Sequence, residues 1–314
     1  MSSLPTVRPI RTVLAATDLS EASKPALHAA GRLAAALGAE LHVVHALADA
    51  LDPRLDFLTE EFAAKVLKEA QDELQAMSSA MGDGTAALVS VEVRRGVAVD
   101  VVLEDIKRIK ADLLVLGTHG RTGLERLALG SVAEHLASVV PIDVLLVPAE
   151  ADGPYRRPLI AARDDEFSMR AAARAIAVAG KLGFEAIDLV SAFELPYGWH
   201  YVAGDDASHL ERMRAIRSDG LALAIKALKA AGLSGEQVLE EGTASKVVKQ
   251  TIDRLGSDLV FVGSHNRPAW TAMLLGDTAR NIAHSLDRAS LWLVRSLPEK
   301  HPLLDHLLRD LGLR

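Results

Sequence analysis

A glycine-rich segment near the middle of the chain has the residue types and spacing of a phosphate-binding loop. It contains Gly117-Thr118-His119-Gly120, then nine residues, then Gly130-Ser131. Glycine lets the backbone take a positive φ or come close to a ligand, and successive amides can then hold an anion. A helix starting near Ser131 would add its unpaired N–H groups, and the Ser131 hydroxyl could cap that helix and bond a phosphate oxygen. The alternative is that the glycines serve a tight turn and Ser131 only caps.

The same pattern recurs in altered form 146 residues later. It contains Gly263-Ser264-His265-Asn266, nine residues, and Gly276-Asp277. The Asn266 side chain occupies space that a phosphate needs, although Asn tolerates a left-handed φ. A carboxylate from Asp277 at a helix start satisfies the same amides and repels a polyphosphate. The second copy is therefore predicted to bind such a ligand weakly or not at all.

One offset of 146 relates further features of the two halves and indicates a duplicated domain. It carries Asp18 to Asp164, Gly96 to Gly242, and Leu41-His42-Val43-Val44 to Ile187-Asp188-Leu189-Val190. With this offset, Arg163 takes the place of Thr17 and adds bulk beside Asp164.

Short β-like runs alternate with longer amphipathic segments that must position these loops. The predicted strands are Thr12–Ala16, Glu40–His45, Val89–Arg94, Asp112–Leu116 and Val144–Val147, then Leu159–Ala162, Ala186–Val190, Gln237–Glu241, Leu259–Val262 and Leu291–Val294. In the first half, apolar spacing of three and four residues predicts helices over Lys24–Leu37, Phe62–Met81, Val99–Lys110 and a segment starting near Ser131. Alternation of this kind implies right-handed βαβ crossovers. The predicted fold class is α/β, with two doubly wound five-stranded parallel-sheet domains in tandem.

The domain boundaries follow from the repeat. We expect domains at residues 1–150 and 151–296, with a linker over Pro148–Pro158 and a C-terminal amphipathic tail at residues 297–314. The apolar stripe of this tail is expected to pack on its own domain or on a partner chain. The aromatic segment Tyr197–Tyr201 either covers an unused pocket or forms a ligand or partner contact.

Composition excludes several function classes. A net charge of -7 and only 12 aromatic residues argue against a nucleic-acid groove. Cysteine is absent, so thiol nucleophiles and cysteine-bound metals are excluded. Met1–Arg11 lacks an apolar core for a signal peptide, and no apolar run approaches the ~18 residues of a membrane helix, so the cytoplasm is the expected location. The histidines offer no metal site; His42 and His45, for example, are three apart on a predicted strand and cannot share a face.

The pattern GxxG, nine residues, G[ST], with an Asp ending the first strand, resembles the ATP-binding pattern of the universal stress protein family. The resemblance covers about residues 8–296 and implies a Rossmann-like, adenine nucleotide alpha hydrolase-like fold. It implies that ATP, possibly with magnesium held through its phosphates, binds in the first half. The implied cofactor-binding residues are Ala16 at the ribose, Thr17 beside it, Asp18 at the adenosine part, the Ala46 backbone at the adenine edge, and Gly117, Gly120, Gly130, Ser131 and Val132 at the phosphates.

Some of these roles have alternatives. Arg121 and Arg126 could add charge near the phosphates or lie on a solvated face, and Asp18 could cap a helix with Ser20. His119 and His265 hold equivalent positions, which favours a structural role over a general base.

Three functions remain open at this point. The leading one is an ATP-binding stress or regulatory protein, with nucleotide in the first domain only; the others are a slow ATPase and a non-catalytic scaffold that binds a protein partner through the second domain or the tail. The resemblance also implies intramolecular pairing of Val144–Val147 with Leu291–Val294, and possibly a homodimer.

Overall fold

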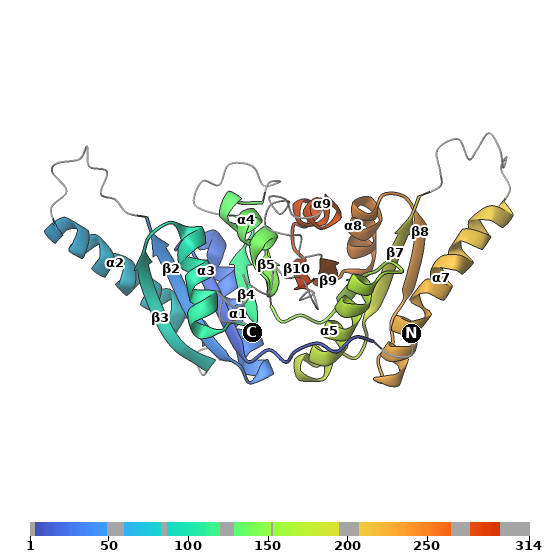
Figure 1. Ribbon diagram of the computed structural model, residues 1–314, viewed down its shortest axis with the longest axis horizontal. Helices are drawn as coiled ribbons and strands as arrows, with labels where there is room; N and C mark the ends of the chain where they lie inside the picture. Colours follow the sequence, from blue (N-terminus) through green and yellow to red (C-terminus); the bar gives the residue numbers. More distant parts are fainter. Residues whose placement is uncertain are drawn as a thin grey trace, which may run out of the picture. The chain divides into compact units, whose positions relative to one another are not determined.

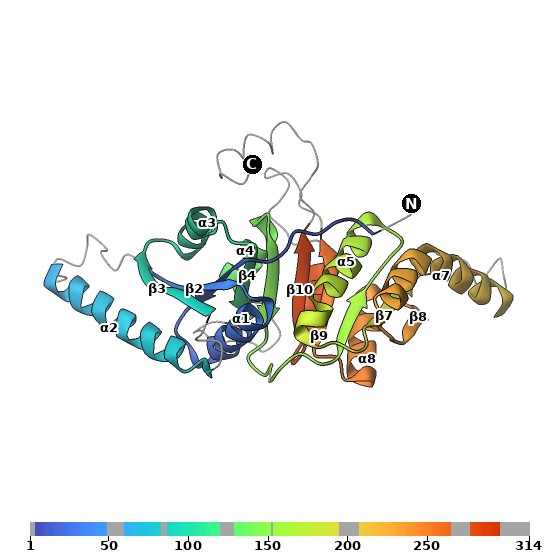
Figure 2. The ribbon, with the colours of Figure 1, turned by 90° about the horizontal axis from the view of Figure 1, so that it is seen from below.

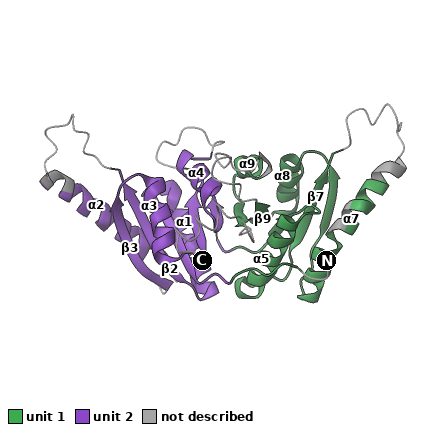
Figure 3. Ribbon diagram, in the orientation of Figure 1, with its two compact units in different colours: residues 1–8, 155–265, 276–296 green, residues 9–154, 266–275, 297–314 purple. Residues whose placement is uncertain are grey.

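The computed structural model describes residues 4–48, 60–82, 87–119, 129–151, 153–194, 207–264 and 277–295. The chain divides into two compact units (Figure 3). The N-terminal unit contains Pro9–Pro154, and the C-terminal unit contains most of the chain from Tyr155 onward together with residues 4–8. The predictions for Gly120, Arg121, Arg126, Tyr197–Tyr201, Asn266 and the tail lie outside the described residues.

The N-terminal unit is a parallel sheet with helices on both faces (Figure 1). Its strand order is β3-β2-β1-β4-β5. The strands are β1 (Thr12–Thr17), β2 (Glu40–Leu47), β3 (Leu88–Arg95), β4 (Leu113–Gly117) and β5 (Asp143–Val147), and the helices are α1 (Lys24–Leu37), α2 (Glu60–Ser79), α3 (Ala98–Ile109) and α4 (Ser131–Val139). α1 and α2 cover one face, and α3 and α4 cover the other (Figure 2). Because the order reverses between β1 and β4, their carboxyl ends leave a crevice between diverging connections.

Burial explains why the central segments form strands. β5 is buried at every position, and β1 and β4 at nearly every position, as expected for strands covered on both faces. α1 ends at Gly38, which takes a left-handed conformation with φ 66°. The prediction of a helix over Lys24–Leu37 is confirmed to the residue.

The C-terminal unit repeats this architecture, with strand order β10-β9-β6-β7-β8 and parallel pairing throughout. Its strands are β6 (Pro158–Ala161), β7 (Asp188–Phe193), β8 (Gln237–Glu241), β9 (Leu259–Ser264) and β10 (Ser290–Arg295), and its helices are α5 (Glu166–Leu182), α7 (Ala207–Ala230), α8 (Ala244–Leu255) and α9 (Asp277–Ser285). The predicted fold class is confirmed. The pairing of Val144–Val147 with Leu291–Val294 would join the two units, and it stays a prediction.

The prediction of one constant offset of 146 residues between the halves is wrong at the first strand. The Asp112 carboxylate accepts hydrogen bonds from the backbone N–H groups of Arg11 and Thr12, at 2.8 and 3.2 Å. Asp258 accepts the same pair from Arg156 and Arg157, at 2.7 and 3.0 Å. Asp112 and Asp258 are 146 apart, whereas Arg11 and Arg156 are 145 apart. The first strand and α1 therefore follow an offset of 145.

The offset changes again toward the end of each half. His42 pairs with Leu14 and Asp188 with Leu159, which confirms 146 for the second strand. Asp143 pairs with Leu113 and Ser290 with Leu259, so the last strand follows 147. The equivalent of Asp18 is consequently Arg163, and the predicted match with Asp164 is wrong.

Within the described ranges, no helix is both long enough and apolar enough to cross a membrane.

Candidate functional site

A pocket lies at the carboxyl ends of the strands in the N-terminal unit. Eight of the ten predicted cofactor-binding residues line it: Ala16, Thr17, Asp18, Ala46, Gly117, Gly130, Ser131 and Val132. The other two, Gly120 and Arg121, lie outside the described residues. The structure thus brings four separate stretches of the chain together, and their role in binding stays a prediction.

Sequence reasoning missed several lining residues. They include Ser23, His45, Ala98, Val102, Leu116 and Ala133. Ala98 and Val102 lie four residues apart on α3 and so share a helix face. Glycine and serine patterns carry no signal for such an apolar wall, although the start of an amphipathic helix after the third strand could have indicated it.

The start of α4 is free of a side-chain cap. Gly130 is the N-cap residue, with φ -57° and ψ 140°, and as glycine it has no side chain that could cap the N–H groups of the first turn. Ser131 is the first helical residue, so the prediction that it caps the helix is wrong. The Gly130 N–H donates to the Thr118 carbonyl at 2.8 Å, which fixes the loop end against β4. An uncapped helix start directs N–H groups and a positive dipole end toward an anion.

The two described glycines of the motif do not need a positive φ. Gly130 has φ -57°, and Gly117 is the last residue of β4. A Cβ built on Gly117 would lie 3.6 Å from Ser23 Cα and from the His119 carbonyl, which is ordinary contact. Of the two roles expected for glycine, close approach of a ligand is the one that the geometry leaves.

The loop after β1 is held by its own hydroxyl groups. Asp18 Oδ1 accepts from the Ser20 N–H at 3.0 Å and from the Ser20 hydroxyl at 2.6 Å. The Thr17 hydroxyl bonds that of Ser23 at 2.7 Å and accepts from the Leu19 N–H at 3.0 Å. On the alternative of a helix cap with Ser20, Ser20 is the N-cap residue of the short 3-10 turn Glu21–Ser23 that precedes α1, and it makes no side-chain cap bond. Asp18 instead forms an Asx turn at the pocket.

Two histidines line the pocket. His45 Nδ1 donates to the Thr17 carbonyl at 2.8 Å, since a carbonyl can only accept. In the neutral tautomer, Nε2 of His45 is therefore an acceptor. His119 Nδ1 lies 2.8 Å from the Thr118 hydroxyl. Its Nε2 atom is buried without a hydrogen bond to any residue that the structure describes.

In the C-terminal unit, backbone lies close to the glycine that corresponds to Gly117. A Cβ built on Gly263 would lie 2.1 Å from the Phe167 carbonyl oxygen, whereas the Ala22 oxygen lies 3.7 Å from the Cβ position of Gly117. With the offset of 145, Phe167 is the equivalent of Ala22. The start of α5 thus lies much closer to the end of β9 than the 3-10 turn Glu21–Ser23 lies to the end of β4.

Helix α5 begins earlier than its counterpart because Asp165 caps it. Asp165 Oδ1 accepts from the Ser168 N–H at 2.8 Å. Burial works to raise the pKa of Asp165, but the Ser168 hydrogen bond and nearby Arg163 outweigh it and hold this pKa below its ordinary value. Asp165 is therefore an ionised cap at neutral pH.

Two positions of the C-terminal unit have arginine where the equivalent positions of the N-terminal unit have other residues. Arg163 replaces Asp18, and Arg295, buried at the end of β10, donates to the Ser264 hydroxyl at 2.9 Å.

Over the described ranges, no cluster of three or more His, Asp or Glu side chains could hold a metal ion.

A doubly wound parallel sheet with a pocket at the reversal of strand order defines a Rossmann-like α/β fold. The model of the universal stress protein family matches residues 9–148 and again residues 154–295. The chain belongs to the universal stress protein family, with two copies of its domain.

Individual relatives match one domain or both. A universal stress protein of Methanocaldococcus jannaschii is 31% identical over 44% of this chain and 81% of its own length. The crystal structure of a universal stress protein from Archaeoglobus fulgidus is similar over 90% of this chain and 98% of that chain, with a TM-score of 0.61 and 19% identity. A universal stress protein solved in complex with cAMP is 30% identical and covers 45% of this chain and 99% of that chain, with a TM-score of 0.33.

Proposed function

We propose that this protein binds ATP in its N-terminal unit only and acts as a nucleotide-dependent stress or regulatory protein. One observation carries the proposal. Eight residues predicted from a sequence pattern, spread over more than 100 positions, line a single pocket beside an uncapped helix start. Separate segments that meet in this way form an anion site with room for a nucleoside beside it.

The placement of ATP follows the elements around the pocket. The phosphates would lie at the N–H groups of Ser131 and Val132, close to Gly117. The ribose would lie at Ala16 and Asp18, and the adenine at the Ala46 backbone next to the apolar wall of α3. Magnesium would be bound through the phosphates, because such ions commonly keep their waters and use few protein ligands.

The restriction to one unit is supported by the changes in the other. Arg163 replaces the Asp18 carboxylate, and the Phe167 carbonyl approaches the strand end where Gly117 leaves space. The sequence differences at Asn266 and Asp277 act in the same direction, because a carboxylate at a helix start competes with phosphate.

Native mass spectrometry of the full chain with ATP, together with calorimetric titration, tests this proposal. We expect one ATP per chain. Two would contradict the asymmetry, and none would favour the scaffold function. Titration with cAMP in parallel distinguishes a polyphosphate site from a site for a nucleoside with a single phosphate. Release of ADP in the same sample would support the slow ATPase.

A carboxylate placed at the start of α4 should abolish binding. In Gly130→Asp, the new side chain would satisfy and neutralise the N–H groups proposed for phosphate, so we expect ATP affinity to fall by about 100-fold or more. The matched control is Thr243→Asp, which adds the same charge at the N-cap of α8 in the C-terminal unit. Retained affinity in Gly130→Asp would mean that the phosphates lie elsewhere.

A further inference from the structure

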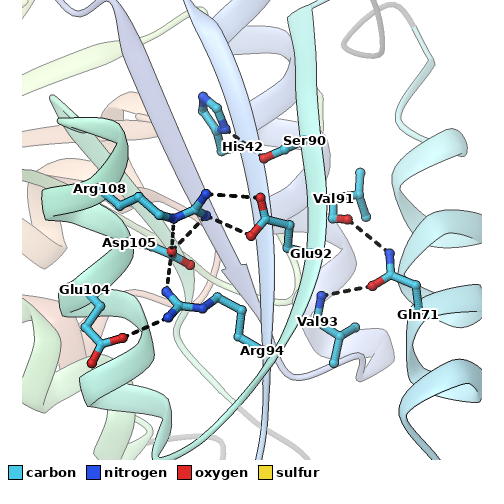
Figure 4. A network of polar contacts seen from close by, with 10 residues as sticks. All are labelled: His42, Gln71, Ser90, Val91, Glu92, Val93, Arg94, Glu104, Asp105 and Arg108. Carbon is cyan, nitrogen blue, oxygen red and sulfur yellow. Dashed lines mark hydrogen bonds and ion pairs between the residues drawn. The ribbon is translucent and has the colours of Figure 1, made fainter. Parts of the chain in front are cut away.

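A buried carboxylate joins α3 to the outer strand β3 in the N-terminal unit (Figure 4). The Asp105 side chain is 1% exposed, and its Oδ1 atom accepts from Arg94 Nη1 at 2.6 Å and from Arg108 Nε at 2.9 Å. Arg108 also binds both carboxylate oxygens of Glu92 on β3, at 2.8 and 3.3 Å. Arg94, Asp105 and Arg108, here called the clamp, thereby fix α3 to β3 across the helix–sheet interface.

The clamp is a costly way to attach a helix. Burying a carboxylate is unfavourable unless its charge is paired and its oxygens are hydrogen-bonded. Asp105 Oδ2 is buried without a hydrogen bond among the described residues, so only one of its two oxygens is satisfied. Replacing a buried ion pair with apolar residues often leaves the stability of a protein unchanged or raises it. This suggests that the clamp has a role other than stability.

The C-terminal unit shows that the fold does not require the clamp. With the offset of 146 that applies to these elements, Thr251 takes the place of Asp105 and Glu240 that of Arg94. Thr251 is buried and donates its hydroxyl to the Val247 carbonyl of its own helix at 2.8 Å. Arg254, the equivalent of Arg108, pairs with Glu236 at 2.7 Å, with both side chains about half exposed. The clamp therefore occurs in the unit with the intact glycine motif and is replaced in the other.

Helix α3 connects the clamp to the pocket. Ala98 and Val102, in its first two turns, line the pocket, and Val102 lies three residues before Asp105 on neighbouring positions of the helix surface. α3 also packs against β1, β2 and α4, whose ends contribute further lining residues to the pocket. A shift of α3 along β3 would change the distance between this apolar wall and the strand ends.

We propose that Asp105 is a positioning residue for the nucleotide pocket: through Arg94 and Arg108 it fixes the wall that α3 contributes. This inference rests on the proposed function, since the ligand of that wall is the proposed nucleotide. It assigns to the clamp an effect on nucleotide affinity in addition to its effect on stability.

The test is Asp105→Thr, which installs the residue of the C-terminal unit. We expect ATP affinity, measured by calorimetry well below the thermal transition, to fall by about tenfold. Hydrogen exchange in the protein without ligand should accelerate at residues 98–102 and stay unchanged in α1. An unaltered affinity and unaltered exchange at residues 98–102 would overturn the proposal, even if the melting temperature fell.

Two further variants complete the design. Glu104→Gln is the matched control, because Glu104 pairs with the same Arg94 at 2.8 Å but is 62% exposed, and we expect less than about a twofold change in affinity. Arg94→Gln removes one donor while Arg108 still pairs with Asp105, so it answers the question if Asp105→Thr does not fold. A loss of the same sign and smaller size supports the clamp, and an unchanged affinity contradicts it.

These experiments distinguish failure of the proposed function from failure of the clamp proposal. If the wild-type protein binds no ATP, the nucleotide proposal falls. Faster exchange at residues 98–102 in Asp105→Thr would still establish that the clamp positions α3, and unchanged exchange there would overturn the clamp separately.

Discussion

Equivalent glycines in the two units have different surroundings. The Cβ of an alanine at Gly263 would overlap the Phe167 backbone at 2.1 Å, whereas one at Gly117 would meet its neighbours at 3.6 Å. We expect Gly263→Ala to lower the free energy of unfolding by about 1–3 kcal/mol, because backbone must move to accept it. Gly117→Ala should change it by less than about 0.5 kcal/mol.

Chemical denaturation of the two variants measures the difference. Equal losses would show that the start of α5 relaxes at little cost, and a larger loss at Gly117 would contradict the geometry at both glycines.

The cap of α5 should depend on pH. Asp165→Ala removes the acceptor for the Ser168 N–H, and we expect a loss of about 1 kcal/mol at pH 7. The pKa of Asp165 in the folded protein lies below its ordinary value of 3.8, so its charge stabilises the fold fully above that value. This stabilisation is lost as the pH falls through the lowered pKa.

Urea titrations of the wild type and Asp165→Ala at several pH values between 7 and 3 test this dependence. The gap in unfolding free energy should narrow at the acidic end; a gap that widens there would show that the carboxyl group caps better when protonated.

At the scale of elements, local patterns predicted most of the secondary structure. The helix Lys24–Leu37 and the strand Gln237–Glu241 were predicted to the residue, since apolar periodicity and flanking glycine or polar residues mark their ends. α2 was displaced by two residues, because apolar periodicity alone does not fix where a helix begins and ends.

Features that depend on contacts between elements were not predictable. The clamp joins Arg94 and Asp105 across a turn between β3 and α3, and a charged residue inside a helix is ordinarily solvent-exposed. Similarly, the Ser131 hydroxyl matched a capping pattern, but the helix starts one residue too early for Ser131 to be the N-cap. The glycine motif predicted the position of the pocket, whereas the wall that α3 contributes could be identified only in the folded structure.

Residues 4–8 attach to the C-terminal unit through α5. Arg174, only 6% exposed, donates from Nη1 to the Arg8 carbonyl at 2.6 Å. Arg174→Met keeps the apolar stem and removes the donor, so we expect hydrogen exchange at residues 4–8 to rise and the unfolding free energy to fall by about 1–3 kcal/mol. Arg170→Met is the control, because Arg170 pairs with Glu166 on the same helix. If both variants behave alike, the Arg8 contact is not what holds the segment.

At the scale of the whole molecule, the chain contains two copies of one fold that differ in the residues at the carboxyl ends of the strands. Both cores keep the same strand order, and the positions facing the pocket differ, which is why the family match covers both halves while the glycine motif is intact in one. Sequence alone revealed the duplication, because glycines such as Gly96 and Gly242 recur at fixed spacing. It misaligned Asp18, because a constant spacing cannot register a one-residue change in a connecting loop.

The successive offsets of 145, 146 and 147 record the divergence of the two copies. The first step falls between Gly38 and His42, and the second between Val140 and Asp143, both in connections from a helix to a strand. A single-residue insertion inside a strand would turn every later side chain to the opposite face, whereas a loop absorbs it. The copies thus lengthened only where their cores tolerated it, and the same history makes Arg163 the residue that corresponds to Asp18.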